Sequence, residues 1–495
     1  MEEMNEELLA PIEEVCEVSE DEIGSDAVKA DTELPSLNHA DLAKDFLASE
    51  CGKNFYRVYD ISGKPVASWT GTRWVLSDDT DLLRSGVRDY LDRLHDSLPK
   101  PEKGRDYRTK LKSAPFCRDV TTEVLIKLPP IKREAFDRDE YMLGLPDGIV
   151  AELRTGAIRQ MMREDFISQR LYLKPDARST PRFDRFLDEI TLGNAELKTF
   201  ILRLCALCLT AHPFQGLFFF WGRGRNGKGV LLRLLASILG RSFTATFRPN
   251  ELTVSKYDED KAKRSLNKLE GARLATVDES LGCNLNLPLL KLMSGGDVLS
   301  AARMRQDDRQ FKPSHKLVLP TNEKPDLPND PAFRGRVYFV PFLADYSDRA
   351  KQDLELETTL ATEAPGILAQ LIALCPDVIA YGLRAPKTVT DATSELLEEN
   401  DLTKQFQEDM LADAPGVNIS LDEMQDAIHK WVTGSERGMY QTGVMSQRHA
   451  MDSQTNRIIA ELKARLPYKR LRPNGKQGRR IYYFLNFALR TDETN

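Results

Sequence analysis

The sequence predicts an α/β protein, and three observations support this fold class. Residues 217–221, Leu-Phe-Phe-Phe-Trp, form an apolar and aromatic run that is typical of a buried strand. A glycine-rich segment follows at 222–228, and the apolar stretch 230–239 then has the composition of a buried helix. Further strand and helix signals alternate after this unit, which indicates a sheet covered by helices.

The elements ahead of this unit predict an α+β region. Residues 55–77 alternate apolar and polar side chains across two turn signals, so we expect a small antiparallel sheet. Residues 79–98 have a helical pattern, and residues 147–156 indicate a hairpin. We expect residues 182–211 to form an amphipathic helix that leads into the central strand.

The glycine-rich segment has the form of a phosphate-binding loop. It fits the pattern G-x-x-x-x-G-K and lies between a strand and a helix. Glycines let the backbone wrap an anion, and the N–H groups of the loop and of the helix N-terminus point toward it. An ordinary glycine-rich turn is the alternative. We expect the nucleotide to be bound by Gly222, Arg223, Gly224, Arg225, Asn226, Gly227, Lys228, Gly229 and Val230.

One position departs from this pattern. The residue after Lys228 is normally Ser or Thr, whose hydroxyl binds magnesium, but here it is Gly229. Magnesium usually keeps several waters, so a water could fill the free coordination position. Contact with another residue is the alternative. We expect Lys228 to reach the outer phosphates in either case.

Polar residues follow two of the later strands at their C-terminal ends, where α/β sheets place their ligands. Asp278 and Glu279 follow the apolar strand 273–277, and Asn322 follows the strand 316–320. Neighbouring side chains of a strand point to opposite faces, so the two acids have different surroundings. We expect Asp278 to hold Mg²⁺ and Glu279 to orient and deprotonate the attacking water. Asn322 can hold that water or sense the terminal phosphate.

Two arginines lie next to a third strand, which we expect at 336–342. A guanidinium group matches phosphate oxygens and stabilises charge during phosphoryl transfer, so Arg334 and Arg336 are candidate catalytic residues. If either one reaches the nucleotide of a neighbouring subunit, hydrolysis requires an oligomer. Two exposed arginines beside a strand are the alternative.

These motifs together resemble those of superfamily 3 helicases. The segments WGRGRNGKGVLLRLL, RLATVDES, LLKLMSGGDVLSAARMRQDDRQFKPSHKLVLPTNEKPDLP and DPAFRGRVYFVPF are similar, more narrowly, to the helicase part of the phage/plasmid primase–helicase family. That family is related to the poxvirus primase–helicase. The resemblance extends over roughly residues 45–490 and also covers the segments before and after the ATPase.

The resemblance implies an AAA+ type P-loop ATPase that uses ATP and Mg²⁺. It implies a ring, usually a hexamer, that moves 3′ to 5′ on single-stranded DNA. Asp278 and Glu279 would then be the Walker B acids, Asn322 the sensor, and Arg334 or Arg336 the finger that acts on a neighbour. A DNA-contacting hairpin is expected between the acids and the sensor, in a span that contains Lys291, Arg303, Arg305, Arg309, Lys312 and His315. A solvated strand edge is the alternative there.

The C-terminal residues resemble a separate winged-helix-like module. Two helical patterns precede a basic hairpin, and residues 463–480 contain eight Lys or Arg and no acid. Tyr482, Tyr483 and Phe484 adjoin this segment, which suits contact with DNA. Docking of a protein is the alternative. The candidate DNA-binding residues of this module are Lys469, Arg470, Arg472, Lys476, Arg479 and Arg480.

Composition and charge fit an intracellular globular protein. The 495 residues are 41% hydrophobic and 29% charged, with a formal net charge of −7. Residues 1–35 hold thirteen acids and one lysine, so we expect a disordered acidic tail, with a mimic of DNA as the alternative. The seven cysteines are scattered, and the Cys205/Cys208 pair lies on an apolar face, so we expect core cysteines rather than a zinc site. No apolar run appears long enough to span a membrane.

We therefore expect five regions and one leading function. The regions are an acidic tail (1–40), an α+β N-terminal domain (41–180), a helical collar with the ATPase core (181–345), a helical region (346–415) and the winged-helix-like domain (416–495). The function is a cytoplasmic DNA helicase at the replication fork of a phage, plasmid or integrated element, working with a separate primase or polymerase. Two alternatives stay open, an origin-binding initiator ATPase and a nucleotide-binding scaffold with weak hydrolysis.

Overall fold

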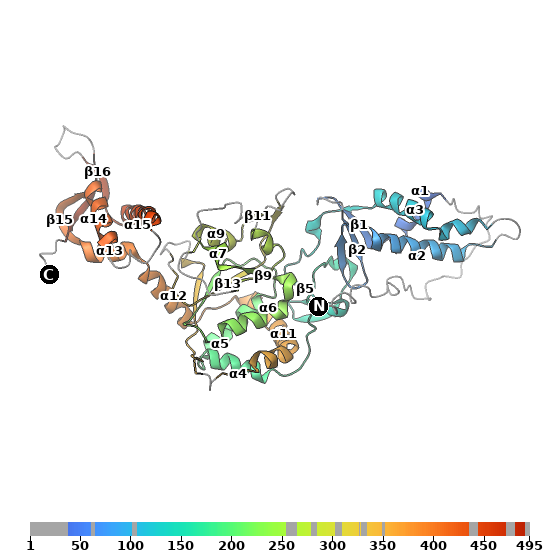
Figure 1. The fold of residues 1–495 in the computed structure, drawn as a ribbon, viewed down its shortest axis with the longest axis horizontal. Coiled ribbons are helices and arrows are strands. Elements are labelled where there is room, and N and C mark those ends of the chain that lie inside the picture. Colours follow the sequence, from blue (N-terminus) through green and yellow to red (C-terminus); the bar gives the residue numbers. More distant parts are fainter. Residues whose placement is uncertain are drawn as a thin grey trace. The chain divides into compact units, whose positions relative to one another are not determined.

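The computed structural model comprises two compact units. Figure 1 shows the helices and strands of the chain. The first unit comprises residues up to 325 together with 336–390, and the second comprises 326–335 with 391–495. The described residues are 38–60, 65–100, 106–253, 265–278, 285–301, 309–325, 327, 334–348, 352–434, 444–471 and 481–490. The acidic tail predicted at the N-terminus lies outside them.

The first unit begins with a four-stranded sheet and three helices. The predicted antiparallel sheet is confirmed, because β2 pairs antiparallel with both β1 and β3. A short strand that was not predicted, β4, extends the sheet by pairing parallel with β1. The helices bury apolar side chains such as Phe46, Leu83 and Val120 in a core that they share with Phe55 and Val66 of the sheet. The elements are α1 (His39–Ala48), β1 (Phe55–Val58), β2 (Val66–Trp69), β3 (Trp74–Ser77), α2 (Asp81–Ser97), α3 (Ala114–Lys127) and β4 (Pro130–Ile131).

A small sheet and two helices connect this region to the central sheet. Strands β5 (Met142–Gly144), β6 (Ile149–Glu152) and β7 (Ala157–Gln160) pair antiparallel, which confirms the predicted hairpin. The single helix predicted over 182–211 is wrong, because the structure has α4 (Pro181–Ile190) and α5 (Ala195–Leu207). Leu192 and Gly193 have φ values of +53° and +75°, which end the helical path, and the Asn194 side chain caps α5.

The central sheet is parallel and has the strand order β14-β8-β13-β10-β9. Its strands are β8 (Leu217–Trp221), β9 (Thr244–Phe247), β10 (Leu274–Val277), β13 (Lys316–Thr321) and β14 (Val337–Pro341). Every residue of β10 and β13 is buried, as expected of strands covered on both faces. This arrangement confirms the predicted α/β class and places the carboxyl ends of all five strands at one edge.

Helices and a hairpin complete the first unit. Helix α6 (Lys228–Phe243) follows β8, and Gly240 interrupts its helical geometry with φ +69° and ψ 176°. Two short helices, α7 (Pro249–Leu252) and α9 (Leu287–Met293), follow β9 and β10 respectively. Strands β11 (Leu299–Ala301) and β12 (Arg309–Phe311) pair antiparallel, so a hairpin does lie between the predicted acids and the predicted sensor.

The long helix α11 (Leu356–Tyr381) corrects one expectation about the sequence. Its length and a mean hydropathy of 1.5 over an 18-residue window would suit a membrane span, although no such run was expected. In the structure its apolar residues, such as Leu368 and Leu371, belong to the main core with α4, α5 and α6. Buried Glu363 accepts hydrogen bonds from the N–H groups of Arg182 and Phe183 at the start of α4. These contacts explain the composition of α11 as that of a core helix.

The second unit packs helices on a three-stranded antiparallel sheet of order β15-β17-β16. Its core contains Phe406, Ile428, Leu462 and Phe484. Helix α12 (Lys387–Glu399) contains the division between the units. The elements after it are α13 (Leu402–Met410), β15 (Leu411–Ser420), α14 (Leu421–Gly434), α15 (Val444–Arg465), β16 (Tyr468–Leu471) and β17 (Ile481–Leu489). The two predicted helices and the hairpin strands are present, whereas β15 was not predicted.

Candidate nucleotide site

The glycine-rich segment forms a loop between β8 and α6, where the sequence placed it. Gly224 and Gly227 have φ values of +100° and +86°, a left-handed conformation that favours glycine. Arg225, between them, also has a positive φ of +47°. The loop therefore turns sharply at the carboxyl end of β8 and delivers Lys228 to the first turn of α6.

Gly222 and Asn226 fix the base of the loop. A Cβ atom at Gly222 would overlap the Asn226 amide and the Phe342 carbonyl oxygen, so only glycine fits there. Asn226 is buried, and its Nδ2 donates a hydrogen bond of 3.0 Å to the Phe342 carbonyl oxygen, directly after β14. The loop is thus tied to a neighbouring strand, and a glycine cradle of this shape fits a phosphate chain.

Lys228 lies at the centre of this arrangement and is only 5% exposed. Its Nζ donates to the Gly222 carbonyl oxygen at 2.9 Å, to Asn226 Oδ1 at 3.3 Å and to Asn322 Oδ1 at 2.8 Å. Burial lowers the pKa of Lys228. No carboxylate among the described residues bonds this ammonium group, so its charge is available for an anionic ligand.

The structure brings the predicted sensor to the predicted phosphate loop. Strand β13 lies between β8 and β10, and Asn322 follows β13 at the same edge as the loop. The contact with Lys228 joins residues that are 94 positions apart in the chain. Asp278 follows β10 at this edge and is exposed, which suits a metal ligand, while Glu279 lies outside the described residues.

Arg336 lies at the opposite edge of the sheet. Its carbonyl oxygen accepts from the N–H of Leu217, the first residue of β8, at 2.8 Å. The whole of β8, a strand of about 16 Å at about 3.3 Å per residue, therefore separates Arg336 from the loop. Arg336 Nη1 donates to the Lys291 carbonyl oxygen at 3.3 Å. Arg334 is exposed. Arg336 therefore lies far from the glycine loop of its own chain.

The predicted DNA-binding residues of the first unit have mixed outcomes. Lys291 lies on α9, and its contact with DNA stays a prediction. His315, in the same span, is buried and cannot face DNA. Arg303 and Arg305 lie outside the described residues. Lys312, directly after β12, is exposed and pairs with Glu140 at 2.5 Å.

In the second unit, Lys469 and Arg470 lie exposed on β16, while Arg472, Lys476, Arg479 and Arg480 lie outside the described residues. Tyr468 of β16 stacks on Tyr482 of β17 with ring centroids 5.1 Å apart. The Arg470 guanidinium lies 5.5 Å from the centroid of Tyr482. The expectation that Phe484 contacts DNA is wrong, because this residue is fully buried in the core.

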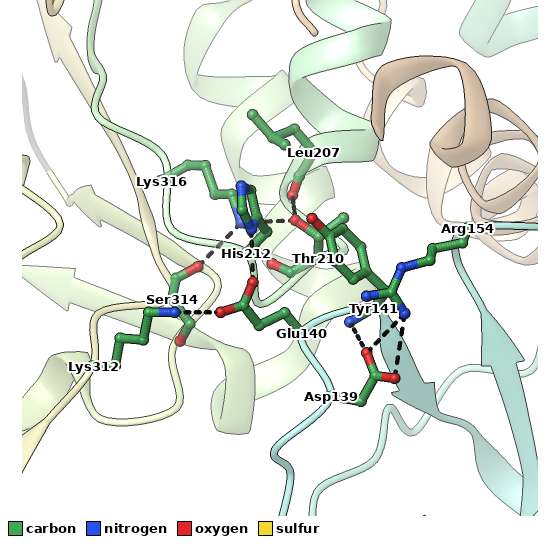
Figure 2. Close-up of polar contacts among 10 residues, drawn as sticks. All are labelled: Asp139, Glu140, Tyr141, Arg154, Leu207, Thr210, His212, Lys312, Ser314 and Lys316. Atoms are coloured by element: carbon green, nitrogen blue, oxygen red, sulfur yellow. Dashed lines mark hydrogen bonds and ion pairs between the residues drawn. The ribbon is translucent and has the colours of Figure 1, made fainter. Parts of the chain in front are cut away.

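A polar network that the sequence did not indicate links the N-terminal region to the hairpin β11–β12. Figure 2 shows Glu140 between two partners, the His212 ring at 2.6 Å and the Lys312 ammonium group at 2.5 Å. Burial raises the pKa of Glu140, but hydrogen bonds from Lys312 and His212 outweigh burial and lower it overall. Glu140 lies 172 positions from Lys312, so no local sequence pattern could reveal the pair.

Comparisons with known proteins agree with the motifs. Residues 44–192 match the family described as D5 N terminal like. The chain is 24% identical over 332 residues to the "Putative helicase L207/L206" of Acanthamoeba polyphaga mimivirus, covering 61% of this chain and 34% of that protein. It is 26% identical over 255 residues to the "Putative helicase 022R" of Frog virus 3 (isolate Goorha), covering 48% and 26%. The chain is similar to D5-like primase–helicases.

The chain spans about a third or less of the length of the curated relatives that it matches. Among solved structures, it is similar to the apo structure of the NrS-1 C terminal region (305-718), with a TM-score of 0.46 and 11% identity. That match covers 92% of this chain and 100% of the other. The relatives from large DNA viruses carry the name "Putative helicase".

Proposed function

We propose that the chain is an ATP-dependent DNA helicase with an AAA+ type P-loop core, which moves 3′ to 5′ on single-stranded DNA as a ring of subunits. The observation that carries this proposal is the contact between Lys228 and Asn322. It joins the phosphate loop to the neighbouring strand end through a buried cation whose acceptors among the described residues are neutral. The helicase names of the viral relatives support the same class of activity.

In the proposed ATP hydrolysis, each group of residues has a separate role. Bound ATP with Mg²⁺ supplies the free energy and the reacting phosphate. The glycine loop holds the phosphate chain through backbone N–H groups, and Lys228 exchanges its carbonyl acceptors for phosphate oxygens, which form stronger charge-assisted bonds. Asp278 holds the metal shell, and Glu279 orients the attacking water and accepts its proton. Arg334 or Arg336 of the adjacent subunit stabilises the developing charge.

DNA would be held at two places in this proposal. Arg303 and Arg305, between β11 and β12 in the sequence, would contact single-stranded DNA in the central channel of the ring. The second unit, with a winged-helix-like role, contributes Lys469, Arg470 and the exposed ring of Tyr482. Its core holds helices against the sheet, so a basic strand such as β16 is presented on a rigid support.

The deciding experiment measures Mg²⁺-dependent ATP hydrolysis by the full chain with and without single-stranded DNA. Lys228→Ala should lose hydrolysis by at least about a hundredfold, because the buried cation of the phosphate site is removed. Lys174→Ala, at an exposed lysine paired with Asp147, is the matched control and should keep wild-type activity. Hydrolysis that is indifferent to Lys228→Ala would overturn the proposal. Sharp protection of one duplex site without strand displacement would favour the origin-binding initiator instead.

A further inference from the structure

Gly229 leaves space at the first turn of α6, and the structure shows what lies there. A Cβ atom at Gly229 would lie 3.1 Å from Nη1 of Arg233, and the remaining near contact is the Cζ atom of the same guanidinium group. Arg233 therefore occupies the surroundings in which the hydroxyl of a Ser or Thr side chain would otherwise extend. The chain thus lacks a hydroxyl group at position 229 and places the Arg233 guanidinium group beside that position.

The position of Arg233 on the helix explains its reach. Residues four apart share a helix face, and helical side chains lean toward the N-terminus, so the side chain of Arg233 extends over Gly229 and toward the loop. Its neighbours Leu231, Leu232 and Leu234 are buried, whereas the Arg233 side chain is 63% exposed. The guanidinium group is thus on the open side of α6, at the end where the nucleotide loop begins.

Glu357 sets the orientation of the guanidinium group. Arg233 Nη2 donates to Glu357 Oε1 at 2.5 Å, and Nε donates to Oε2 at 3.4 Å. This side-on pair uses Nε and Nη2 and leaves Nη1 over Gly229. No hydrogen-bond partner of Nη1 lies among the described residues. An exposed ion pair of this kind adds little stability, about 1 kcal/mol at most, so stability alone does not account for it.

We propose that Arg233 binds the phosphates of the nucleotide directly and takes the place of the missing hydroxyl, with Glu357 as the positioning residue. The inference rests on the proposed nucleotide site. A hydroxyl acts through magnesium, whereas a guanidinium group neutralises phosphate charge itself and donates in a fixed planar geometry. Nucleotide binding by this chain should therefore depend less on Mg²⁺ than binding through a hydroxyl-bearing loop.

The test measures binding of ADP to the full chain by calorimetry, once with Mg²⁺ and once with EDTA. The wild type should bind in both conditions. Arg233→Ala should weaken binding about tenfold or more in EDTA, because a charge-assisted hydrogen bond to phosphate is lost. Arg233→Lys should recover part of the affinity, since the charge returns without the planar fork. Glu357→Gln should weaken binding less than Arg233→Ala does.

A second pair of variants separates this role from a purely structural one. Gly229→Ser combined with Arg233→Ala should restore affinity in Mg²⁺ but not in EDTA, because the new hydroxyl acts through the metal. Arg241→Ala, at an exposed arginine near the other end of α6, is the matched control and should leave both affinities unchanged. Equal melting temperatures would confirm that the variants are folded.

The outcomes distinguish this inference from the proposed function. If Lys228→Ala abolishes ADP binding while Arg233→Ala binds as the wild type does in both conditions, the role of Arg233 is wrong and the nucleotide site stands. If Lys228→Ala leaves ADP binding intact, the nucleotide site itself is wrong. An affinity loss in Arg233→Ala that is larger in EDTA than in Mg²⁺ supports the inference.

Discussion

At the residue scale, the hydrogen-bond acceptors around Lys228 explain how its ammonium group can be buried. Three neutral oxygens, from Gly222, Asn226 and Asn322, accept hydrogen bonds from the ammonium group, and no carboxylate in the described part of the chain does. A carboxylate in the same place would compete with phosphate for the charge. If the chain binds a nucleotide as proposed, Lys228 and Asn322 are already in contact before it binds.

A second lysine, Lys316, is buried for a different reason. It begins β13, and its Nζ donates to the Thr210 carbonyl oxygen at 2.6 Å, to Thr210 Oγ1 at 3.0 Å and to the Ser314 carbonyl oxygen at 3.1 Å (Figure 2). Burial lowers the pKa of Lys316 to about 7. Lys316 thus binds the segments before β8 and before β13 at the edge opposite the nucleotide loop.

This lowered pKa predicts how stability changes with pH. Between about pH 7 and pH 10.5, the unfolded state carries a proton on Lys316 that the folded state has lost, so its contribution to stability rises with pH. Below pH 7 both states are protonated, and the cost of the buried charge is constant. We expect Lys316→Met to remove a slope of up to about 1.4 kcal/mol per pH unit in that window.

The measurement is chemical denaturation of the wild type and Lys316→Met at several pH values from 6 to 10. Only the difference between the two curves is interpreted, because buried Cys205 and Cys208 have raised pKa values and oppose the trend above pH 8. Parallel curves across the window would show that Lys316 does not titrate as expected.

At the scale of elements, a chain of contacts connects the N-terminal region with the hairpin β11–β12. Arg154, after β6, lies 4.0 Å from the centroid of the Tyr141 ring, which stacks on His212 at 5.5 Å. His212 pairs with Glu140, and Glu140 pairs with Lys312 directly after β12 (Figure 2). The Glu140–Lys312 ion pair therefore connects the base of the hairpin to the N-terminal region. A movement of the hairpin would change this contact.

We predict that reversing the charge of Glu140 or of Lys312 uncouples DNA binding from ATP hydrolysis. In Glu140→Lys the hairpin base meets a like charge at Lys312, so the stimulation of hydrolysis by single-stranded DNA should fall several-fold. Basal hydrolysis should stay unchanged, since neither residue touches the phosphate loop. The double reversal Glu140→Lys/Lys312→Glu should restore stimulation, and thermal stability should change by no more than about 1 kcal/mol for an exposed pair.

The control is Arg154→Ala, which removes the cation over Tyr141 but leaves the ion pair at the hairpin in place. It should affect stimulation less than the reversal at Glu140. Failure of the double reversal to recover stimulation, with both single variants folded, would mean that the pair does not act as a unit.

The sequence was sufficient for the elements whose signals are local. The strand β8, the glycine loop and the strand ends at Asp278 and Asn322 could all be predicted, because buried parallel strands are apolar throughout and end in polar residues. The break between α4 and α5 could not be predicted, because Leu192 adopts a positive φ without a glycine signal of its own. The short strand β4 contains Pro130 and pairs over two residues, so it carries no pattern.

The contacts that refine the site depend on distant parts of the chain and were beyond sequence reasoning. Glu357 meets Arg233 across 124 positions, and Lys312 meets Glu140 across 172. One signal was available, since Arg233 lies four residues after Gly229 and so shares its helix face. His315 and Phe484 are buried, which shows that sequence alone does not separate DNA-contacting basic and aromatic residues from core residues.

At the scale of the whole molecule, the distance between Arg336 and Lys228 bears on whether the proposed ATP site needs residues from two subunits. Arg336 aligns with the start of β8, whereas Lys228 follows its end, so one chain cannot bring both to the same phosphate. If Arg336 takes part in hydrolysis, it does so in the site of a neighbour. A heterologous contact of that kind repeats around a closed ring.

Mixing two inactive variants tests this arrangement directly. One variant is Lys228→Ala, and the other is the double variant Arg334→Ala/Arg336→Ala; each alone should hydrolyse ATP at least about a hundredfold more slowly than the wild type. In a ring formed by random mixing at equal amounts, about a quarter of the interfaces pair an intact Lys228 with an intact arginine. The mixture should therefore regain hydrolysis toward about a quarter of the wild-type rate if sites act independently.

Rescue requires that subunits assemble together, so the two variants are mixed before ATP and single-stranded DNA are added. Mixing each variant with itself at the same total concentration controls for assembly alone. A mixture no more active than its components, although light scattering shows mixed oligomers, would place the arginines and Lys228 in independent roles. Activity of the arginine variant by itself at the wild-type rate would remove Arg334 and Arg336 from catalysis, and the sites would then be complete within single chains.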